Sequence, residues 1–509
     1  DEHQGYGGGP ITNEGAGGEI YGTIYYVVES EHEAGTIYTG SDDGLIHVTR
    51  DAGQTWTNVT PGDLEEGQIN SMEVSPHDPA TVYAAYTRYK FNDFTPHLLV
   101  SNDYGENWED RTTGIPEEAW VKVVREDPVR PGLLYMGTET GIFASWDQGE
   151  NWQPMQLNLP NTPINDLIVQ RRENDLVAAT SGRSFWILDD LTPMQNATNV
   201  EGSESYLLPP RHAYRLASGG FGGFAENVGQ NPPSGAIVQY YMAEEPAEGD
   251  SVTVEIMSTA GEIIRTYSTH PDEDVSPGAQ PITVEAGHNR LAWNLRHEQI
   301  PNIPGAYVFG SLAGRRVIPG TYQVRLTAGD FTQTQSLEVR KDPRVDATMA
   351  EYVEQDQFVA QVARELTDIH HAAIDVNDVD DQVETLMGRI EGRDGADVVG
   401  EAADALMEEL TTVADSLYQA RVVDGQTVIN FPSRLKFQYV VLHGNAEGAE
   451  TGVSRGSEDV LSDLRVRWTS HDATVRQLLG PRLDEFNRLL AEHGFGAIIR
   501  PPERRRTIS

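Results

Sequence analysis

The sequence predicts a mainly β chain in three successive parts: repeated four-stranded units, a β-sandwich and a helical region. Three observations carry this prediction. A short motif of Asp, Gly and Trp recurs at fixed spacing within residues 21–205. Apolar and polar residues then alternate between turn signals over residues 206–345. Over residues 346–500 the apolar residues instead recur every three or four positions, the period of a buried helix face.

Composition limits the possible functions. The 509 residues include 79 acidic and 37 basic ones, and the net charge of -42 disfavours nucleic acid as a partner. The acidic residues are spread along the whole chain, which favours a solvated surface adapted to high salt, as in a halophile-like proteome. There is no cysteine, so disulfides and Cys-ligated metals are excluded. No apolar run approaches the ~18 residues of a membrane helix, so we expect no transmembrane segment.

The repeated motif occurs as TRDAGQTW from Thr49, SNDYGENW from Ser101 and SWDQGENW from Ser145. This spacing predicts a tight hairpin in which the Gly adopts a positive φ and the Asp accepts backbone N–H groups of the loop. The Trp is expected to start the next strand and to pack inward. We therefore expect structural roles for Asp51, Gly53 and Trp56, for Asp103, Gly105 and Trp108, and for Asp147, Gly149 and Trp152.

Residues 1–20 are rich in Gly and polar residues and are expected to form a linker. Four units follow, and each opens with an apolar run, which starts at Thr23, Ile69, Val121 or Ile164. In the last unit FWILDDLTP replaces the motif. About four short strands per unit predict about four β-propeller blades over residues 21–205.

The motif resembles the Asp-box, or BNR repeat, of sialidase-like and sortilin-like β-propellers. Longer stretches, such as GSDDGLIHVTRDAGQTWTNVTP and SGRSFWILDD, are similar to the C-terminal portion of a large prokaryotic family with sortilin-type propellers. Members of that family are often labelled glycosyl hydrolase. Because such propellers have more than four blades, the resemblance implies that further blades complete the ring, from a missing region or from another chain.

Short predicted strands continue from about Gly235. The stretches AGHNRLAWNLR and VIPGTYQVRL resemble the immunoglobulin-like module of flagellar-hook capping proteins. The resemblance implies an Ig-like β-sandwich over residues 206–345, with Trp293 as its core tryptophan.

Helical spacing then predicts packed helices over residues 346–500, before a basic tail at 501–509. The predicted apolar positions of these helices are Tyr352, Val359, Val362, Leu366, Ile369, Val399, Ala403, Leu406, Leu410, Val413, Leu417, Val460, Leu464, Leu478, Leu479, Leu483, Phe486 and Leu490. The acidic segment DVNDVDD from Asp375 lacks the residues of an EF-hand, so it is expected to connect two helices. A second break is expected at HGNAEGAETGVSRGS from His443. We predict no metal site and no cofactor.

A ligand is expected at the turns between the second and third strands, because the Asp-box lies at the opposite end of a blade. The candidate ligand-binding residues in these turns are Asp42, Asp43, Arg88, Asp93, Glu139 and Arg183. Carboxylates, arginines and aromatic residues together suit a sugar or a peptide. The alternative is that they are ordinary solvated turn residues.

The leading interpretation is a secreted or envelope-associated binding protein that recognises a peptide, protein or glycan and has no catalytic residues. One alternative is a sialidase-like glycoside hydrolase. It would need two suitably spaced carboxylates and a set of arginines, for which Arg88, Arg125 and Arg183 lack a matching motif. Another is a structural component of a larger assembly, as a homo-oligomer or with a second chain.

Overall fold

The computed structural model describes residues 22–216, 229, 231–271 and 279–502. It divides the chain into two compact units, Asp1–Glu201 and Gly202–Ser509, which are taken separately below. The expected linker lies outside the described residues, as does the expected tail except for Pro501 and Pro502. No helix among the described residues is long and apolar enough to cross a membrane.

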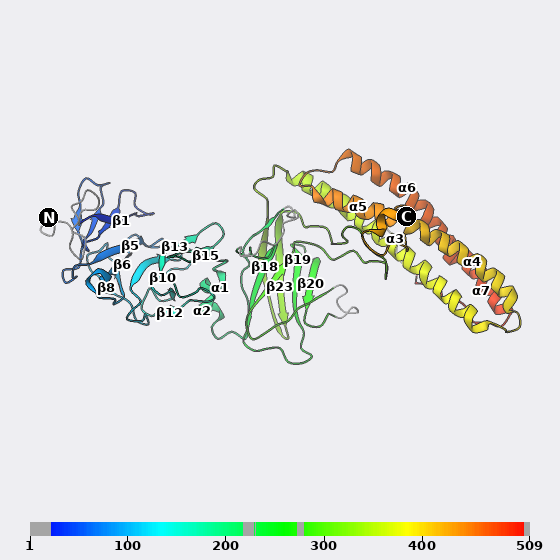
Figure 1. Cartoon of the computed structure of the whole chain (residues 1–509), viewed down its shortest axis with the longest axis horizontal. Helices are drawn as coiled ribbons and strands as arrows, with labels where there is room; N and C mark the ends of the chain where they lie inside the picture. The colour runs from blue at the N-terminus through cyan, green and yellow to red at the C-terminus, as the bar shows by residue number, and fades with distance from the viewer. Residues whose placement is uncertain (1–21, 217–228, 230, 272–278, 503–509) are drawn as a thin grey trace. The chain divides into compact units, whose positions relative to one another are not determined.

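Unit one is a succession of four antiparallel sheets, here called the first to fourth blades (Figure 1). The first blade comprises β1 (Ile24–Glu29), β2 (Ile37–Ser41), β3 (Ile46–Thr49) and β4 (Thr57–Asn58). The second comprises β5 (Gln68–Val74), β6 (Val82–Thr87), β7 (His97–Ser101) and β8 (Glu109–Asp110). The third comprises β9 (Val121–Glu126), β10 (Leu134–Thr138), β11 (Ile142–Ser145) and β12 (Gln153–Pro154). The fourth comprises β13 (Ile164–Gln170), β14 (Asp175–Thr180) and β15 (Phe185–Leu188).

Each pair of neighbouring blades encloses its own apolar core. The second strand of the second blade shows how one strand serves two cores, because its side chains alternate between the two faces of the sheet. Val82 and Tyr86 pack toward the first blade, whereas Tyr83 and Ala85 pack toward the third. The first strands β1, β5, β9 and β13 contact one another in sequence. This is the packing of propeller blades.

The three Asp-boxes connect the third and fourth strands of their blades. Their glycines have φ values of 89°, 90° and 88°, in the left-handed region that the turn requires. In the second blade Asp103 accepts hydrogen bonds from Ser101 Oγ (2.8 Å), Asn107 N (2.9 Å) and Asn107 Nδ2 (2.7 Å). Asp51 and Asp147 accept equivalent bonds in their own boxes. The carboxylates thus hold the loops in shape.

The Asp-box tryptophans join neighbouring blades. Trp108 Nε1 donates to Val59 O (2.8 Å) and Trp152 Nε1 donates to Arg111 O (3.0 Å), each at the last strand of the preceding blade. We call such a contact a clasp. The expectation that all three pack inward is wrong for Trp56, which is 44% exposed. No blade precedes the first one in the described residues, so Trp56 has no strand there to pack on.

A short helix holds the fourth blade in place of a box. After β15 the chain forms α1 (Thr192–Gln195) and α2 (Ala197–Val200). Trp146 Nε1 of the third blade donates to Met194 O (2.9 Å), and Gln195 Nε2 donates to both carboxylate oxygens of Asp127 (3.1 and 2.9 Å). At the boundary between the third and fourth blades the tryptophan therefore belongs to the earlier blade, and its acceptor lies in the segment that follows the later one.

Unit two begins with two sheets that share one core, which is a β-sandwich arrangement. Trp293 is fully buried in this core. That the sandwich is immunoglobulin-like stays a prediction. One sheet has the order β16 (Ser205–Leu207), β18 (Ala236–Met242), β22 (Gly287–Trp293). The other has the order β17 (Ala213–Arg215), β24 (Phe331–Lys341), β23 (Gly320–Ala328), β19 (Val252–Ser258), β20 (Ile263–Ser268), β21 (Gln280–Pro281).

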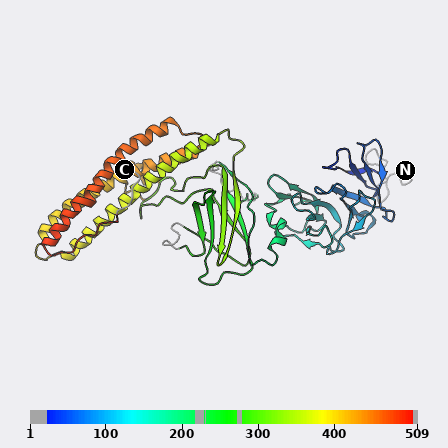
Figure 2. The same ribbon diagram turned by 180° about the vertical axis from the view of Figure 1, so that it is seen from behind.

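The helices of unit two run side by side (Figures 1 and 2). They are α3 (Met349–Ile390), α4 (Ala396–Leu417), α5 (Leu435–Gly448), α6 (Arg455–Gln477) and α7 (Leu483–Glu492). The apolar positions predicted for this region are buried except Val460, which is 46% exposed on α6, so the prediction is wrong for Val460 and the other predicted positions are confirmed. A capping box begins α3, in which Thr348 Oγ1 accepts from Glu351 N and the Glu351 carboxylate accepts from Thr348 N.

One predicted break is wrong, and the other is confirmed at residues 449–454, between α5 and α6, but begins later than predicted. The acidic segment from Asp375 lies inside α3, because Val376, Val379 and Val383 continue the buried stripe and packing outweighs the weak helix propensity of Asp and Asn. The segment from His443 begins inside α5, which continues to Gly448. His443 itself is buried against the bundle, so its Gly-rich neighbours are held in the helix.

Buried charges connect the sandwich to the helices within unit two. Glu450 pairs with Arg215 (3.3 Å) and with Arg316 (2.7 Å), and all three side chains are at most 9% exposed. Arg215 also donates to Gln355 Oε1 of α3 (2.6 Å), and Glu447 accepts from Arg296 (2.8 Å). We call this set the ion-pair joint.

Candidate functional site

A pocket of about 680 Å³ lies among the first strands of the four blades, and we call it the mouth pocket. Every blade contributes to its lining, so it exists only when all four are assembled. The lining residues are Tyr25 and Tyr26; Gln68, Asn70, Ser71 and Tyr89; Trp120, Lys122 and Glu139; and Asn165 and Asp166.

The same backbone irregularity places one side chain from each blade in this pocket. In each blade the register between the first and second strands slips by one residue, as in a β-bulge. The extra residues are Tyr25, Asn70, Lys122 and Asn165, and all four line the mouth pocket. A bulge re-aims a side chain and is common beside binding sites. Four bulges at equivalent positions therefore build one wall of the pocket.

An aromatic cluster forms another part of the wall. The Trp120 ring stacks on Tyr89, with ring centroids 5.7 Å apart and planes at 13°, and it tilts against Phe94 at 5.3 Å. Tyr89 and Phe94 are 41% and 39% exposed, so the cluster presents apolar surface to solvent. Such rings suit the apolar faces of sugars or the apolar side chains of a peptide.

Arg88 and Asp93 hold the loop that carries these rings. The Arg88 guanidinium pairs with Asp93 (2.9 Å) and with Glu65, and its Nε donates to Glu66 O (3.1 Å). Asn92 adopts a left-handed φ of 63° that turns the chain back toward β7. The aromatic cluster is therefore positioned before any ligand binds.

The polar groups of the pocket form a chain of contacts. Lys122 Nζ pairs with Glu139 (2.7 Å) and donates to Asn165 Oδ1 (3.3 Å). Asn70 Nδ2 donates to Val121 O (3.0 Å), and Gln68 Nε2 donates to Asn70 Oδ1 (2.7 Å). The wall thus offers amide donors and acceptors around a charge-neutral ion pair.

Arg125 of the third blade contacts the other three blades through residues that line the mouth pocket. Its guanidinium donates to Tyr26 Oη (2.9 Å) on the first blade, Ser71 Oγ (3.0 Å) on the second and Asp166 Oδ1 (2.9 Å) on the fourth. The Arg125 side chain is only 12% exposed. Its role is to hold the first strands together.

Arg125 also lines a second cavity of about 420 Å³, which we call the acidic cavity because Glu31, Glu73 and Glu126 line it too. Burial raises the pKa of Glu73 to about 7, while the nearby Arg125 acts in the opposite direction. Arg171 pairs with Glu31 at 2.5 Å. A carboxyl group that titrates near neutral pH is a candidate general acid.

The structure does not bring the six candidate residues together. Glu139 lines the mouth pocket, and Arg88 and Asp93 support it through the aromatic loop. Asp42 instead accepts from the backbone N–H groups of Gly22 (2.8 Å) and Thr23 (2.9 Å). Two further candidates have local roles: Asp43 accepts from Ser41 Oγ, and Arg183 contributes its backbone to the β14–β15 turn.

Sequence reasoning missed the bulge residues and Trp120. Their signal is present in the repeats, since each unit opens with a β-branched residue followed by the bulge residue, as in Ile69-Asn70 and Ile164-Asn165. An alignment of the four units at these residues would have marked the position. Trp120 directly precedes β9 and has no equivalent tryptophan in the other units.

No cluster of His, Asp and Glu side chains suited to a metal ion occurs in the described part of the chain. No protein-family model matches the sequence, and no curated protein matches it.

Solved β-propeller structures are similar to the chain at low identity. A structure of YCF48 bound to D1 peptide is 18% identical, over 33% of this chain and 51% of that one, with a TM-score of 0.27. The GH74 enzyme of Niastella koreensis is 13% identical, over 62% and 46%, with a TM-score of 0.28. The Cps50 (Swd1) β-propeller domain of Myceliophteria thermophila is 11% identical, over 34% and 66%, with a TM-score of 0.23. The chain therefore spans about half the length of the first two.

Proposed function

We propose that unit one is a binding module whose mouth pocket recognises an extended peptide segment of a partner protein. The observation that carries this proposal is the set of four bulge residues, one from each blade, converging on one pocket beside exposed aromatic rings. Asn70 and Asn165 each carry a donor and an acceptor, which matches the paired N–H and C=O groups of a peptide. The aromatic cluster supplies a surface for an apolar side chain of that peptide.

The pocket volume is in the range of small-ligand sites, so we expect it to take a few residues rather than a large surface. The ion pair of Lys122 and Glu139 is neutral overall, which favours a peptide without strong net charge. A glycan is the competing ligand, because hydroxyl groups also match amides and aromatic rings.

Screening the whole chain against a displayed peptide library and a glycan array tests the proposal. We expect peptide binders whose affinity falls about tenfold or more in Trp120→Ala, since a desolvated aromatic anchor typically contributes more than 1 kcal/mol. Asn165→Ala should weaken the same peptides. Trp56→Ala is the matched control, because Trp56 is an exposed tryptophan that does not line the pocket. Glycan binding without peptide binding, or an unchanged affinity in Trp120→Ala, would refute the peptide proposal.

A second candidate function is glycoside hydrolysis, and Glu73 favours it. Its raised pKa and its place beside Glu31, Glu126 and Arg125 in the acidic cavity are features of a general acid. Assays with chromogenic sialosides and other glycosides test this candidate. Activity that Glu73→Gln abolishes would support it, and no turnover by the wild-type chain would eliminate it.

We further infer that the chain is a secreted or envelope-associated, salt-adapted member of the sortilin-type Asp-box propellers. The three Asp-boxes and the net charge of -42 support this inference. On this view the sandwich is immunoglobulin-like, and further blades or a second chain contact the exposed apolar residues Val27 of the first blade and Phe185 of the fourth. Fractionation of the source cells, with the chain found in the cytoplasm, would count against it.

A further inference from the structure

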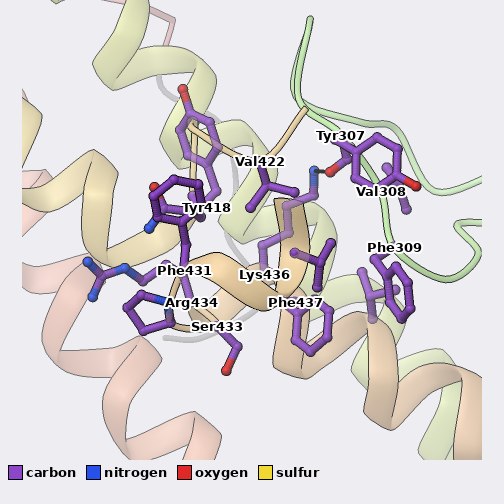
Figure 3. Close-up of a pocket in the computed structure, with 14 residues that line it drawn as sticks. Tyr307, Val308, Phe309, Tyr418, Val422, Phe431, Ser433, Arg434, Lys436 and Phe437 are labelled. Atoms are coloured by element: carbon purple, nitrogen blue, oxygen red, sulfur yellow. Dashed lines mark hydrogen bonds between the residues drawn. The ribbon is translucent and has the colours of Figure 1, made fainter. Parts of the chain in front are cut away.

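Unit two contains a second apolar pocket, here called the helical pocket, at the start of α5 (Figure 3). Its volume is about 120 Å³, which is smaller than the 680 Å³ of the mouth pocket. Its walls come from the segment between α4 and α5, from the first turns of α5 and from the loop at 307–309. Phe309 and Phe437 stack in this wall, with ring centroids 5.9 Å apart and planes at 26°.

A lysine without an acidic partner lies in this apolar pocket. Lys436 is 6% exposed, and its Nζ donates to Asn302 Oδ1 (2.9 Å) and Tyr307 O (3.2 Å). Figure 3 shows its side chain extending between Val422 and Tyr307. Both acceptors are neutral, and no carboxylate of the described residues forms an ion pair with Lys436. Burial lowers the pKa of Lys436 to about 8, so the amine still carries its proton at neutral pH.

A second cation lines the same pocket. Arg434 forms no ion pair with any residue that the structure describes, and its Nε is buried without a hydrogen-bond partner. Acidic residues outnumber basic ones by 79 to 37 in this chain, so the lack of a carboxylate beside two neighbouring cations is unexpected. A buried charge without a counter-ion is costly, and a bound anion would remove that cost.

The start of α5 adds to the positive potential. Arg434 is the N-cap residue of this 14-residue helix, and its side chain makes no capping hydrogen bond to the first backbone N–H groups. Free N–H groups and the helix dipole both attract an anion to a helix N-terminus. The pocket therefore combines aromatic walls with a buried ammonium group, the start of a helix and an arginine at its rim.

We propose that the helical pocket binds a small amphipathic monocarboxylate, with its apolar body against Phe309, Phe431 and Phe437. The carboxylate accepts a hydrogen bond from Lys436 Nζ, while the Arg434 guanidinium, which extends away from Lys436 in Figure 3, adds to the positive potential at the rim. Aromatic and aliphatic walls make the pocket selective for an apolar body, while the buried ammonium makes it selective for a negative head group. This site is independent of the mouth pocket in unit one.

Calorimetric titration of the full chain tests the site. The probes are decanoate and phenylpropanoate, each compared with its neutral amide, so that only the head-group charge differs. We expect each carboxylate to bind about tenfold or more tightly than its amide, as a charge-assisted hydrogen bond in a buried site predicts. Equal affinities for acid and amide, or no binding of either acid, would overturn the proposal.

The decisive variant is Lys436→Met, which keeps the length of the side chain and removes its charge. We expect it to lose the preference for carboxylate while it retains the affinity for the amides. The variant loses the cost of a buried ammonium but also its hydrogen bonds to Asn302 Oδ1 and Tyr307 O, so its thermal midpoint should stay close to that of the wild type. Lys341→Met is the control lysine in the same unit, because Lys341 does not line the pocket.

Arg434→Gln gives a second readout should Lys436→Met not fold. Arg434 is partly exposed, so its replacement leaves the core of the bundle unchanged. We expect its affinity for decanoate to fall about threefold or more, with the affinity for decanamide unchanged. A preference for carboxylate that survives in both variants would show that the positive charges of this pocket do not bind the ligand.

Discussion

At the residue scale, three copies of the Asp-box place their tryptophans in different environments. Trp152 is 4% exposed, whereas Trp56 at the same position of its own box is 44% exposed. The local turn is the same in both, with glycine φ values of 88° and 89°. The difference comes from the neighbouring blade, so the motif encodes the hairpin and the blade packing decides the burial.

This difference predicts unequal costs for one substitution. Trp152→Ala should destabilise unit one by about 3–5 kcal/mol, because a large buried side chain and its bond to Arg111 O are lost. Trp56→Ala should cost less than about 1 kcal/mol, as is usual for an exposed position. Urea unfolding of the two variants against the wild type measures both. Similar losses in the two variants would contradict the clasp.

The candidate site could be predicted only in part at this scale. Glu139 and the loop of Arg88 and Asp93 follow from the expected strand turns, since turn position is a local property. The bulge residues could not be found in the same way, because a slip in strand pairing depends on the partner strand. Asp42 lies in an expected turn, yet it does not line the mouth pocket. Its carboxylate instead accepts hydrogen bonds from backbone N–H groups at the start of its own blade.

At the element scale, α3 shows how packing overrides local composition. Its 42 residues pass through an acidic stretch that disfavours a helix in isolation. The apolar spacing across that stretch is nevertheless maintained. The positions of the buried residues could therefore be predicted from the sequence, while the predicted helix boundary there was wrong because local propensity is the weaker effect.

His370 of α3 makes this element sensitive to acid. It is fully buried, its Nδ1 donates to Pro301 O, and burial lowers its pKa to about 4. In the unfolded chain the pKa returns to about 6.5, so below that pH the unfolded state binds a proton that the folded state excludes. The contribution of His370 to stability is thus complete above about pH 6.5 and is lost as the pH falls toward about 4.

We predict that unit two loses roughly 3 kcal/mol from this group between pH ~7 and pH ~4. Urea midpoints measured across that range should fall less steeply in His370→Gln than in the wild type. A substitution of His270, which is exposed, is the control and should leave the slope unchanged. If the urea midpoints of the wild type and of His370→Gln fall equally with pH, protonation of His370 does not destabilise the folded state.

At the scale of the whole molecule, the folds of the two units could be predicted from the sequence to different extents. The blades of unit one are repeats whose turns are local, so their number and order could be predicted from the sequence. The ion-pair joint of unit two brings Arg215 and Glu450 together from distant parts of the chain. No spacing rule connects such residues, so this part of the fold was not predictable.

The joint predicts that the sandwich and the helices unfold together. Glu450→Gln leaves the guanidinium groups of Arg215 and Arg316 buried without their carboxylate, which should cost about 3–5 kcal/mol. Thermal unfolding followed by circular dichroism should show a lower midpoint. Glu248→Gln is the control, because Glu248 is exposed. An unchanged midpoint in Glu450→Gln would mean that the joint contributes nothing to the coupling.

The tryptophan clasps also determine how unit one should respond to a pulling force. Trp108 links the second blade to the first, Trp152 links the third to the second, and α1 reaches back from the end of the fourth blade to the third. Within the described residues the first blade receives a clasp but offers none. Under tension applied to its two ends, unit one should therefore separate between blades, where a tryptophan bond must break, before the strands within a blade come apart.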